Sequence, residues 1–226
     1  MHTNKIIHWG ILCFAITLGA QAVATEQLPY ETIKSDKPFE LRQYDAYLQA
    51  KVTVDAKFNE AGSEAFRTLF RYIDGGNTQQ QSVAMTTPVT QRASTSQKIA
   101  MTAPVIQQAA SSQEIAMTAP VTQQLDSGGQ FEVAFVMPSK WTLETLPVPT
   151  DERIEIEQVT PQQTAVVRYS GGWSEKKYKK HLGKLQQWIN EQGYKVAAEP
   201  VWARYNPPFM PWFMRRNEIL IRVVKN

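Results

Sequence analysis

Hydrophobic and polar positions alternate along much of this chain with the two-residue period of half-buried β-strands. Phe39 and Leu41 alternate with polar neighbours, and residues 48–54 alternate more strictly. A period of two directs every second side chain to one face of a strand. We therefore predict a sheet with one buried face. The same pattern predicts further strands at residues 131–137, 165–169, 201–205 and 218–224.

Two stretches have helical spacing instead. In the first, four apolar residues fall at i, i+3, i+4 and i+7, and Gly75-Gly76-Asn77 is typical of a helix end. In the second, Ser174 is a good N-cap and Gly193 ends the pattern. The two predicted stripes are Phe66, Leu69, Phe70, Ile73 and Tyr178, Leu182, Leu185, Ile189.

The order of these elements is approximately β-α-β-β, repeated once. Such an order predicts an α+β fold, with helices on a mainly antiparallel sheet. We expect residues 25–37 to be an exposed lead-in and residues 143–150 to be a proline-broken connection.

A sixteen-residue cassette occurs three times within residues 83–130. Met85, Met101 and Met117 mark the copies and follow one another at equal intervals of 16 residues. Val, Ile and Thr favour strands and the Ser-rich spacers favour turns, so the repeat predicts a meander. A proline in each copy removes a ladder donor, which requires an edge or a bulge there. The methionines fit either adaptable core filler or an apolar wall for a flat ligand, and composition favours core filler.

The N-terminus has the pattern of a secretory signal peptide. Lys5 precedes a nearly continuous apolar run at residues 6–19, and Ala22-Val23-Ala24 forms an A-x-A cleavage site. The alternative, an uncleaved anchor, would need a longer apolar run. We expect residues 1–24 to be removed, residues 25–226 to form a single domain, and the protein to be periplasmic or secreted.

Composition narrows the chemistry. The net charge of +3, or +2 without Lys5, is too small and dispersed to indicate nucleic-acid binding. Removal of the leader would take away Cys13 and two of the three histidines. Thiolate catalysis, disulfides and multi-histidine metal sites would then be excluded. Nucleotide-binding motifs and the G-x-S-x-G motif are missing from the sequence. We therefore expect a binding protein and not an enzyme.

Helix one carries the best candidate binding chemistry. Phe66 and Phe70 lie beside Arg67 and Arg71. Such an apolar strip suits a flat ring with two carboxylates, because arginine binds carboxylates bidentately. The alternative is an amphipathic helix with ordinary solubilising charges.

Two further places could contact a ligand. Residues 207–214 (PPFMPWFM) are unusually apolar for a connection, so Met210 and Trp212 would form a pocket rim, a lid on the core, or a weak contact with a membrane surface. His181 would be an axial iron ligand or a half-exposed residue among the lysines of residues 176–180, and its surroundings favour the second interpretation.

Residues 98–105 (KIAMTAPV) resemble the signature of the SOUL family of haem-binding proteins. The third cassette copy departs from the family pattern. The resemblance implies two pseudo-symmetric halves that form a distorted antiparallel β-barrel with the helices outside, and tetrapyrrole contacts around helix one. It extends to residues 66–77, 131–138, 166–173 and 203–220, and so over most of residues 30–224.

We therefore expect reversible, non-covalent binding of haem or a related tetrapyrrole. The expected contacts are Phe66, Arg67, Phe70, Arg71, Met210 and Trp212, with His181 as a possible axial ligand. One alternative is a general module for amphipathic small molecules, since the family's fold resembles effector-binding domains of multidrug-responsive regulators. Another is an envelope interaction protein that docks through the cassette. The sequence does not determine the oligomeric state.

Overall fold

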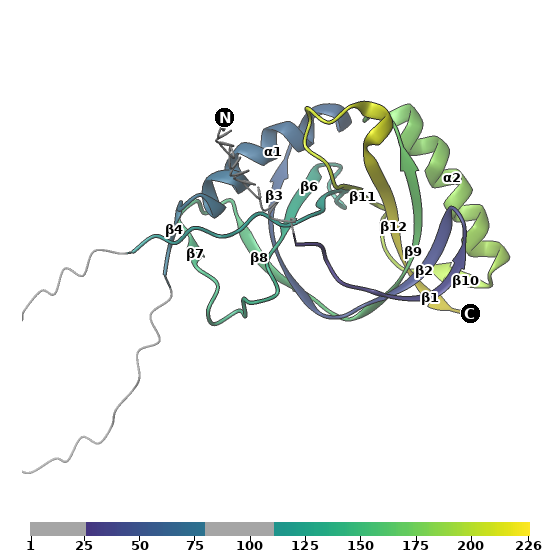
Figure 1. The fold of residues 1–226 in the computed structure, drawn as a ribbon, viewed down its shortest axis with the longest axis horizontal. Helices are drawn as coiled ribbons and strands as arrows, with labels where there is room; N and C mark the ends of the chain where they lie inside the picture. The colour runs from purple at the N-terminus through teal and green to yellow at the C-terminus, as the bar shows by residue number, and fades with distance from the viewer. Residues whose placement is uncertain (1–25, 80–110) are drawn as a thin grey trace, which may run out of the picture.

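The computed structural model describes residues 26–79 and 111–226. Within them, two α-helices lie outside a strongly curved sheet (Figure 1). The first half of the chain contains β1 (Glu31–Asp36), β2 (Phe39–Tyr44), β3 (Tyr47–Val54), α1 (Phe58–Ile73), β4 (Asn77–Thr78), β5 (Val121–Leu125) and β6 (Phe131–Val136). The second half contains β7 (Val148–Pro149), β8 (Glu155–Val159), β9 (Gln162–Ser170), α2 (Glu175–Glu191), β10 (Tyr194–Val196), β11 (Val201–Arg204), the 3₁₀ turn η1 (Trp212–Met214) and β12 (Arg216–Lys225).

The main sheet confirms an antiparallel α+β fold but corrects the expectation of a barrel. Its strands run β1-β2-β9-β12-β11-β5-β6-β3-β8, and every pairing along this path is antiparallel. The end strands β1 and β8 do not pair with each other, so the described sheet stays open. Apart from the extra edge strand β1, the order is symmetric about the β5–β11 pair, with β3-α1-β5-β6 matching β9-α2-β11-β12. The two pseudo-symmetric halves meet where β5 pairs with β11.

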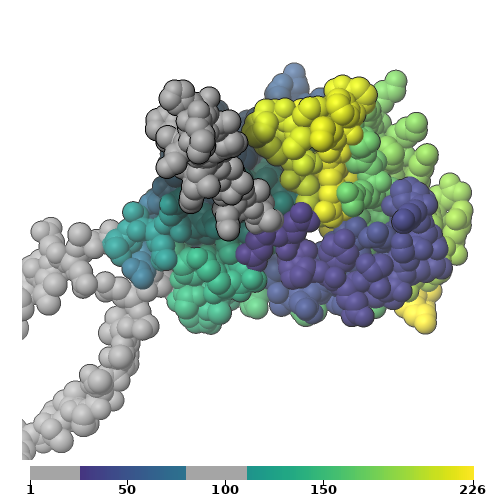
Figure 2. All heavy atoms as spheres, in the orientation of Figure 1, coloured from purple at the N-terminus to yellow at the C-terminus, as the bar shows by residue number. Residues whose placement is uncertain are grey.

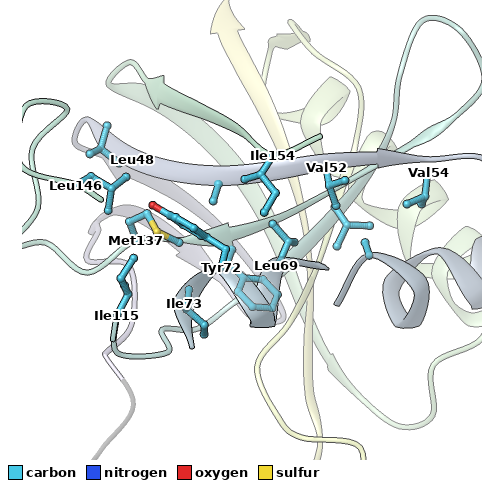
Figure 3. Packing of buried hydrophobic residues seen from close by; sticks show 14 of the residues in the cluster. Leu48, Val52, Val54, Leu69, Tyr72, Ile73, Ile115, Met137, Leu146 and Ile154 are labelled. Carbon is cyan, nitrogen blue, oxygen red and sulfur yellow. The ribbon is translucent and has the colours of Figure 1, made fainter. Parts of the chain in front are cut away.

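Each helix covers the convex face of its own half. The alternating residues of β3 and β6 that face α1 form one apolar cluster, which Figure 3 shows around Leu69 and Tyr72. The corresponding residues of β9 and β12 pack against α2 in a second cluster, around Leu185 and Ile189. The period-two prediction for these strands is therefore confirmed.

The concave face of the sheet is polar. Lys51 of β3 pairs with Glu132 at 3.0 Å and with Glu157 at 3.4 Å. In the other half, Arg42 pairs with Glu218 at 2.8 Å, and both side chains are almost fully buried. Apolar burial therefore lies on the convex side, beneath the helices.

Helix α1 begins earlier than the sequence stripe indicates. Its buried face consists largely of small residues and includes Leu69 and Ile73, whereas Phe66 and Phe70 are excluded from it. The two phenylalanines therefore flank the buried face. The predicted helix end is confirmed, since Gly75 follows the helix with φ = 96°.

Helix α2 begins as predicted. The Ser174 side chain accepts a hydrogen bond from the Lys177 backbone N–H, and Glu175 opens the helix. The expected lead-in differs, because residues 31–36 form the edge strand β1 on β2. No helix in the described ranges is long and apolar enough to cross a membrane.

Only the third cassette copy lies within the described residues. Its Ile115 is buried against α1, and β5 begins directly after Pro120. Met117 is 39% exposed, so core filler is the wrong interpretation for this methionine. The first copy and most of the second, and with them the predicted three-strand meander, lie outside the described residues.

Candidate functional site

A row of aromatic side chains is exposed along one flank of α1. Phe66 and Phe70 stack with ring centroids 5.8 Å apart and are 36% and 41% exposed. Phe135 of β6 supports Phe66 from the sheet side at 5.4 Å. Gly62 is buried, and it lies one turn before Phe66 next to the same flank, since residues four apart are neighbours on a helix surface. We call Gly62, Phe66 and Phe70 the α1 stripe.

The two predicted arginines of α1 differ in their surroundings. Both are exposed. Arg67 makes no ion pair with any residue that the structure describes and is free for a ligand. Asp151 has a pKa lowered to about 2, mainly by its hydrogen bond from Arg153, and the charge of Arg71 adds to this effect. Arg71 therefore lies within electrostatic range of an acidic neighbour.

The loop of residues 207–214 projects from the molecule. Figure 1 shows it in yellow at the top, between α1 and α2, and Figure 2 shows the same segment as a patch on the surface. Phe209 is 85% exposed and Trp212 62% exposed, while Met210 is half-buried. The lid interpretation is wrong, because a lid would bury these rings. A pocket rim and a surface contact both remain compatible with this exposure.

Arg215 holds the loop in place. Its guanidinium donates hydrogen bonds to the carbonyl oxygens of Met210 at 2.7 Å and Pro208 at 2.6 Å. The same group lies 4.3 Å from the ring centroid of Trp173, just before α2. The apolar loop is thus fastened to the N-terminal end of α2.

Arg204 lies between this loop and α1. Its guanidinium is 4.0 Å from the ring centroid of Trp202 and 5.1 Å from that of Trp173. It donates to Gln123 Oε1 at 3.0 Å. A Cβ at Gly62 would be only 2.6 Å from Arg204 Nη1, so the missing side chain allows the guanidinium to approach α1. Burial lowers the pKa of Arg204 to about 10.

The strands beside Arg204 add two more polar groups on the same face. Asn217 is its register partner on β12, and Tyr169 is the partner of Asn217 on β9. We call Tyr169, Trp173, Trp202, Arg204 and Asn217 the Arg204 cluster.

His181 belongs to the edge of this cluster. Its imidazole stacks on Tyr169 with centroids 4.1 Å apart and planes 9° apart, and it is half-buried. Burial lowers its pKa, and the charges of Lys184, Lys180 and Lys177 lower it further. The imidazole is therefore held flat against another ring, while the α1 stripe lies on the other helix.

The concave face of the sheet holds a small cavity with several polar side chains. This cavity of about 220 Å³ is lined by Lys51, Glu132, Glu157 and Tyr205, among others. Sites for drug-sized ligands usually measure about 300–1,000 Å³ and are mostly apolar. The convex α1 stripe suits a flat apolar ring better than this interior does.

Comparison with known proteins assigns the chain to a family. The sequence profile of SOUL heme-binding proteins matches residues 25–98 and 106–222. The chain belongs to the SOUL heme-binding protein family. Heme-binding protein 1 of Xenopus tropicalis and that of Xenopus laevis are each 25% identical to it over 187 residues, which cover 82% of this chain and 84% of each relative.

Solved structures show where the SOUL fold recurs. The EcmrR C-terminal domain matches with a TM-score of 0.50 at 12% identity, covering 87% of this chain and 99% of that one. EcmrR in its complex with DNA gives 0.55 at 10% identity, covering 83% of this chain and 57% of that one. At these identities the likeness shows the fold alone.

The side chains on the convex face fit the family's ligand in two respects. Phe66 and Phe70 offer an exposed apolar surface for a ring, and Arg67 and Arg204 offer cations for carboxylates. Among the described residues, no group of three or more His, Cys, Asp or Glu side chains could hold a metal ion.

Sequence reasoning missed Arg204 and Trp173. The available signal was the alternation along β11, in which Trp202 and Arg204 occupy the same face two residues apart. Trp202 is fully buried, so Arg204, two residues later on the same face of β11, had to be at least partly buried as well. An arginine on the covered face of a strand is uncommon and marks a candidate site.

Proposed function

We propose that this protein binds haem or a related tetrapyrrole reversibly and without a covalent bond. The ring would lie on the α1 stripe, beside the loop of residues 207–214. Arginine side chains would receive the carboxylates, and the polypeptide would not need to supply an iron ligand. The protein would act as a binding protein, with no catalytic step.

The observation that carries this proposal is the exposed, stacked pair Phe66 and Phe70 in a SOUL-family chain. Monomeric proteins rarely leave large apolar patches open without a function. The pair is also preorganised, because Phe135 packs edge-on against Phe66. Both phenylalanines were expected from the sequence to bind the ring, and that assignment stays a prediction.

The size of the ring contact can be estimated. An aromatic side chain buries roughly 200 Å² when fully covered, so about one third, or about 70 Å² per ring, remains available here. A ligand that covers half of it gains about 0.9 kcal/mol per ring at 25 cal/mol per Å². The two rings together would then contribute about 2 kcal/mol, or about 30-fold in Kd.

Titration of the purified protein with haem, followed at the Soret band, tests the proposal. Phe66→Ala with Phe70→Ala should weaken binding about 30-fold. Ile33→Ala is the matched control, since Ile33 is 47% exposed on β1 at the far edge of the sheet and should have no effect. His181→Ala should leave the Soret position nearly unchanged. Loss of the Soret shift in His181→Ala, with normal binding by the double phenylalanine variant, would move the site to α2.

We also propose that the protein is exported and works in the periplasm or outside the cell. The apolar run of residues 6–19 and the A-x-A sequence before Thr25 support this. A binding protein there would meet tetrapyrroles before they enter the cytoplasm.

A further inference from the structure

The Arg204 cluster contains an unusual concentration of unpaired polar atoms. Seven buried side-chain nitrogen or oxygen atoms among the described residues have no hydrogen-bond partner. Five of the seven belong to this one cluster: Tyr169 OH, Trp173 Nε1, Trp202 Nε1, Arg204 Nε and Asn217 Oδ1. Buried polar groups in folded proteins are nearly always paired. So many orphans in one place point to a partner from outside the chain.

The chemistry of these atoms indicates what that partner is. The guanidinium Nε and the two indole nitrogens can only donate. The Tyr169 hydroxyl lies near the Trp202 indole without hydrogen-bond geometry, and it can donate as well. Asn217 Oδ1 is the one atom of the five that can only accept, and its residue lies opposite Arg204 in the β11–β12 register. The missing partner is therefore mainly an acceptor.

The local charge indicates that this acceptor is an anion. Neither Arg204 nor Arg215 forms an ion pair within the described part of the chain. Lys177, on the first turn of α2, extends towards the same place, with Nζ near Gly171 and 5.7 Å from the Trp212 ring. A cation that is largely withdrawn from water is costly to keep without a counter-charge. The cluster therefore needs a negative group, and the described part of the protein does not provide one.

The position of the cluster connects it to the α1 stripe. Arg204 approaches α1 at Gly62, and Phe66 and Phe70 follow on the same flank at four-residue intervals. Eight residues of helix rise about 12 Å. The stripe therefore places two exposed rings on the flank of α1 that the Arg204 guanidinium approaches, and the Nε of this guanidinium has no hydrogen-bond partner among the described residues. A flat molecule on the rings would extend its acidic edge towards Arg204.

We propose that the Arg204 cluster is a carboxylate site that receives one propionate of the tetrapyrrole, with Arg204 as the main binding residue and the Trp173 indole N–H as a second donor. This inference rests on the proposed function and adds to it the orientation of the ligand. A guanidinium matches a carboxylate through two parallel hydrogen bonds, which explains why a planar fork occupies this position.

The test compares haem with haem dimethyl ester, in which the same ring lacks both negative charges. Each is titrated into the purified protein and followed at the Soret band. The wild type should bind haem at least tenfold more tightly than the diester, because a charge-assisted hydrogen bond is lost with the charge. In Arg204→Gln this preference should fall below threefold, mainly through weaker haem binding. Arg222→Gln is the matched control, since Arg222 is exposed on β12 and its guanidinium donates to the Ala197 carbonyl, with no ion pair in the described part of the chain.

Gly62→Ala provides a second variant that should fold at least as well as the wild type. The new methyl group would lie 2.6 Å from Arg204 Nη1, so the flexible guanidinium has to move away. Alanine also has a higher helix propensity than glycine, so the melting temperature should stay the same or rise. A reduced preference for haem over the diester in this variant would show that the position of Arg204 matters, independently of stability.

The possible results separate the two proposals. If the wild type binds haem and the diester equally well, the carboxylate site is wrong while ring binding stands. If the preference persists in Arg204→Gln, the carboxylates bind elsewhere and the site is likewise wrong. If the wild type binds neither ligand, the proposed function fails, and the carboxylate site fails with it.

Discussion

The most demanding test of the fold concerns Glu218, at the centre of the polar network on the concave face. Its carboxylate accepts from Arg42 at 2.8 and 3.1 Å, from Tyr205 at 2.7 Å, and from Arg216 at 3.0 and 2.8 Å. The change Glu218→Gln keeps the size of the side chain and removes its charge. We expect it to destabilise the protein strongly, because Arg42 is 1% exposed and would keep its charge.

The magnitude follows from the bonds that the amide can keep. A glutamine oxygen accepts about two of the five hydrogen bonds, and its NH₂ group faces donors. Removal of one partner of a buried ion pair costs about 3–5 kcal/mol. Glu40 also contacts Arg42, at 2.6 Å, and is partly exposed, so it compensates some of the lost charge. We therefore expect about 3–4 kcal/mol, a large share of a typical stability of 5–15 kcal/mol.

Urea unfolding at neutral pH measures this loss. Glu175→Gln is the control, because Glu175 forms an exposed pair with Lys179 on α2 and should cost at most about 0.5 kcal/mol. The double variant Arg42→Met with Glu218→Gln should be more stable than Glu218→Gln alone, since it no longer leaves the buried charge of Arg42 without its partner. A loss below about 1 kcal/mol in Glu218→Gln would refute this account of the network.

The same network predicts acid sensitivity. Burial alone would raise the pKa of Glu218, but the hydrogen bonds and charges of Arg42 and Arg216, with the Tyr205 hydroxyl, outweigh burial and lower it. A carboxyl with a lowered folded-state pKa stabilises the protein above its unfolded pKa of about 4.5, and this stabilisation is lost as the pH falls through the folded value. The wild type should therefore lose stability below about pH 4.5, and Glu218→Gln should show a flatter profile over that range.

Two further predictions concern the cassette and the N-terminus. Deletion of residues 99–114 removes one period and joins Lys98 to Ile115, so Gln97 takes the place of Gln113. Asn77 contacts Gln113 through the backbone of Gln113, which Gln97 can replace, so cooperative thermal unfolding should persist. Loss of cooperative unfolding would show that the removed copy is part of the core. Mass spectrometry of protein from the cell envelope should find Thr25 as the first residue, whereas soluble cytoplasmic protein that begins at Met1 would refute the predicted signal peptide.

The strands were predictable because their burial is one-sided. Leu48, Ala50, Val52 and Val54 all face α1, so a period of two was visible in the sequence. Ser174 was predictable as a cap because its bond to the Lys177 backbone is local. Closure of the sheet was not predictable in this way. Whether β1 and β8 meet depends on the accumulated twist and curvature of all the strands between them.

The buried face of α1 was misjudged for a different reason. The sequence stripe was built on large apolar residues, whereas the helix turns Ala61, Gly62 and Ala65 towards the sheet. Small residues allow a helix to lie close to its sheet, and this displaces Phe66 and Phe70 to the flank. The phenylalanines kept their predicted role as candidate ring contacts because they are exposed, although the stripe had placed them in the core.

Two arginines on strands show how structure separates a stabilising charge from a candidate binding charge. Arg42 is buried and Arg204 is half-buried, on opposite faces of the sheet. Glu218 pairs with Arg42. Burial alone would lower the pKa of Arg42, but the pairing with Glu218 outweighs burial and raises it. Arg204 has no carboxylate among the described residues, and burial lowers its pKa. Sequence alone does not distinguish these arginines, because each lies on a strand among apolar neighbours. The difference lies in what the fold places opposite each guanidinium, and the one left without an anion lies beside the exposed aromatic rings.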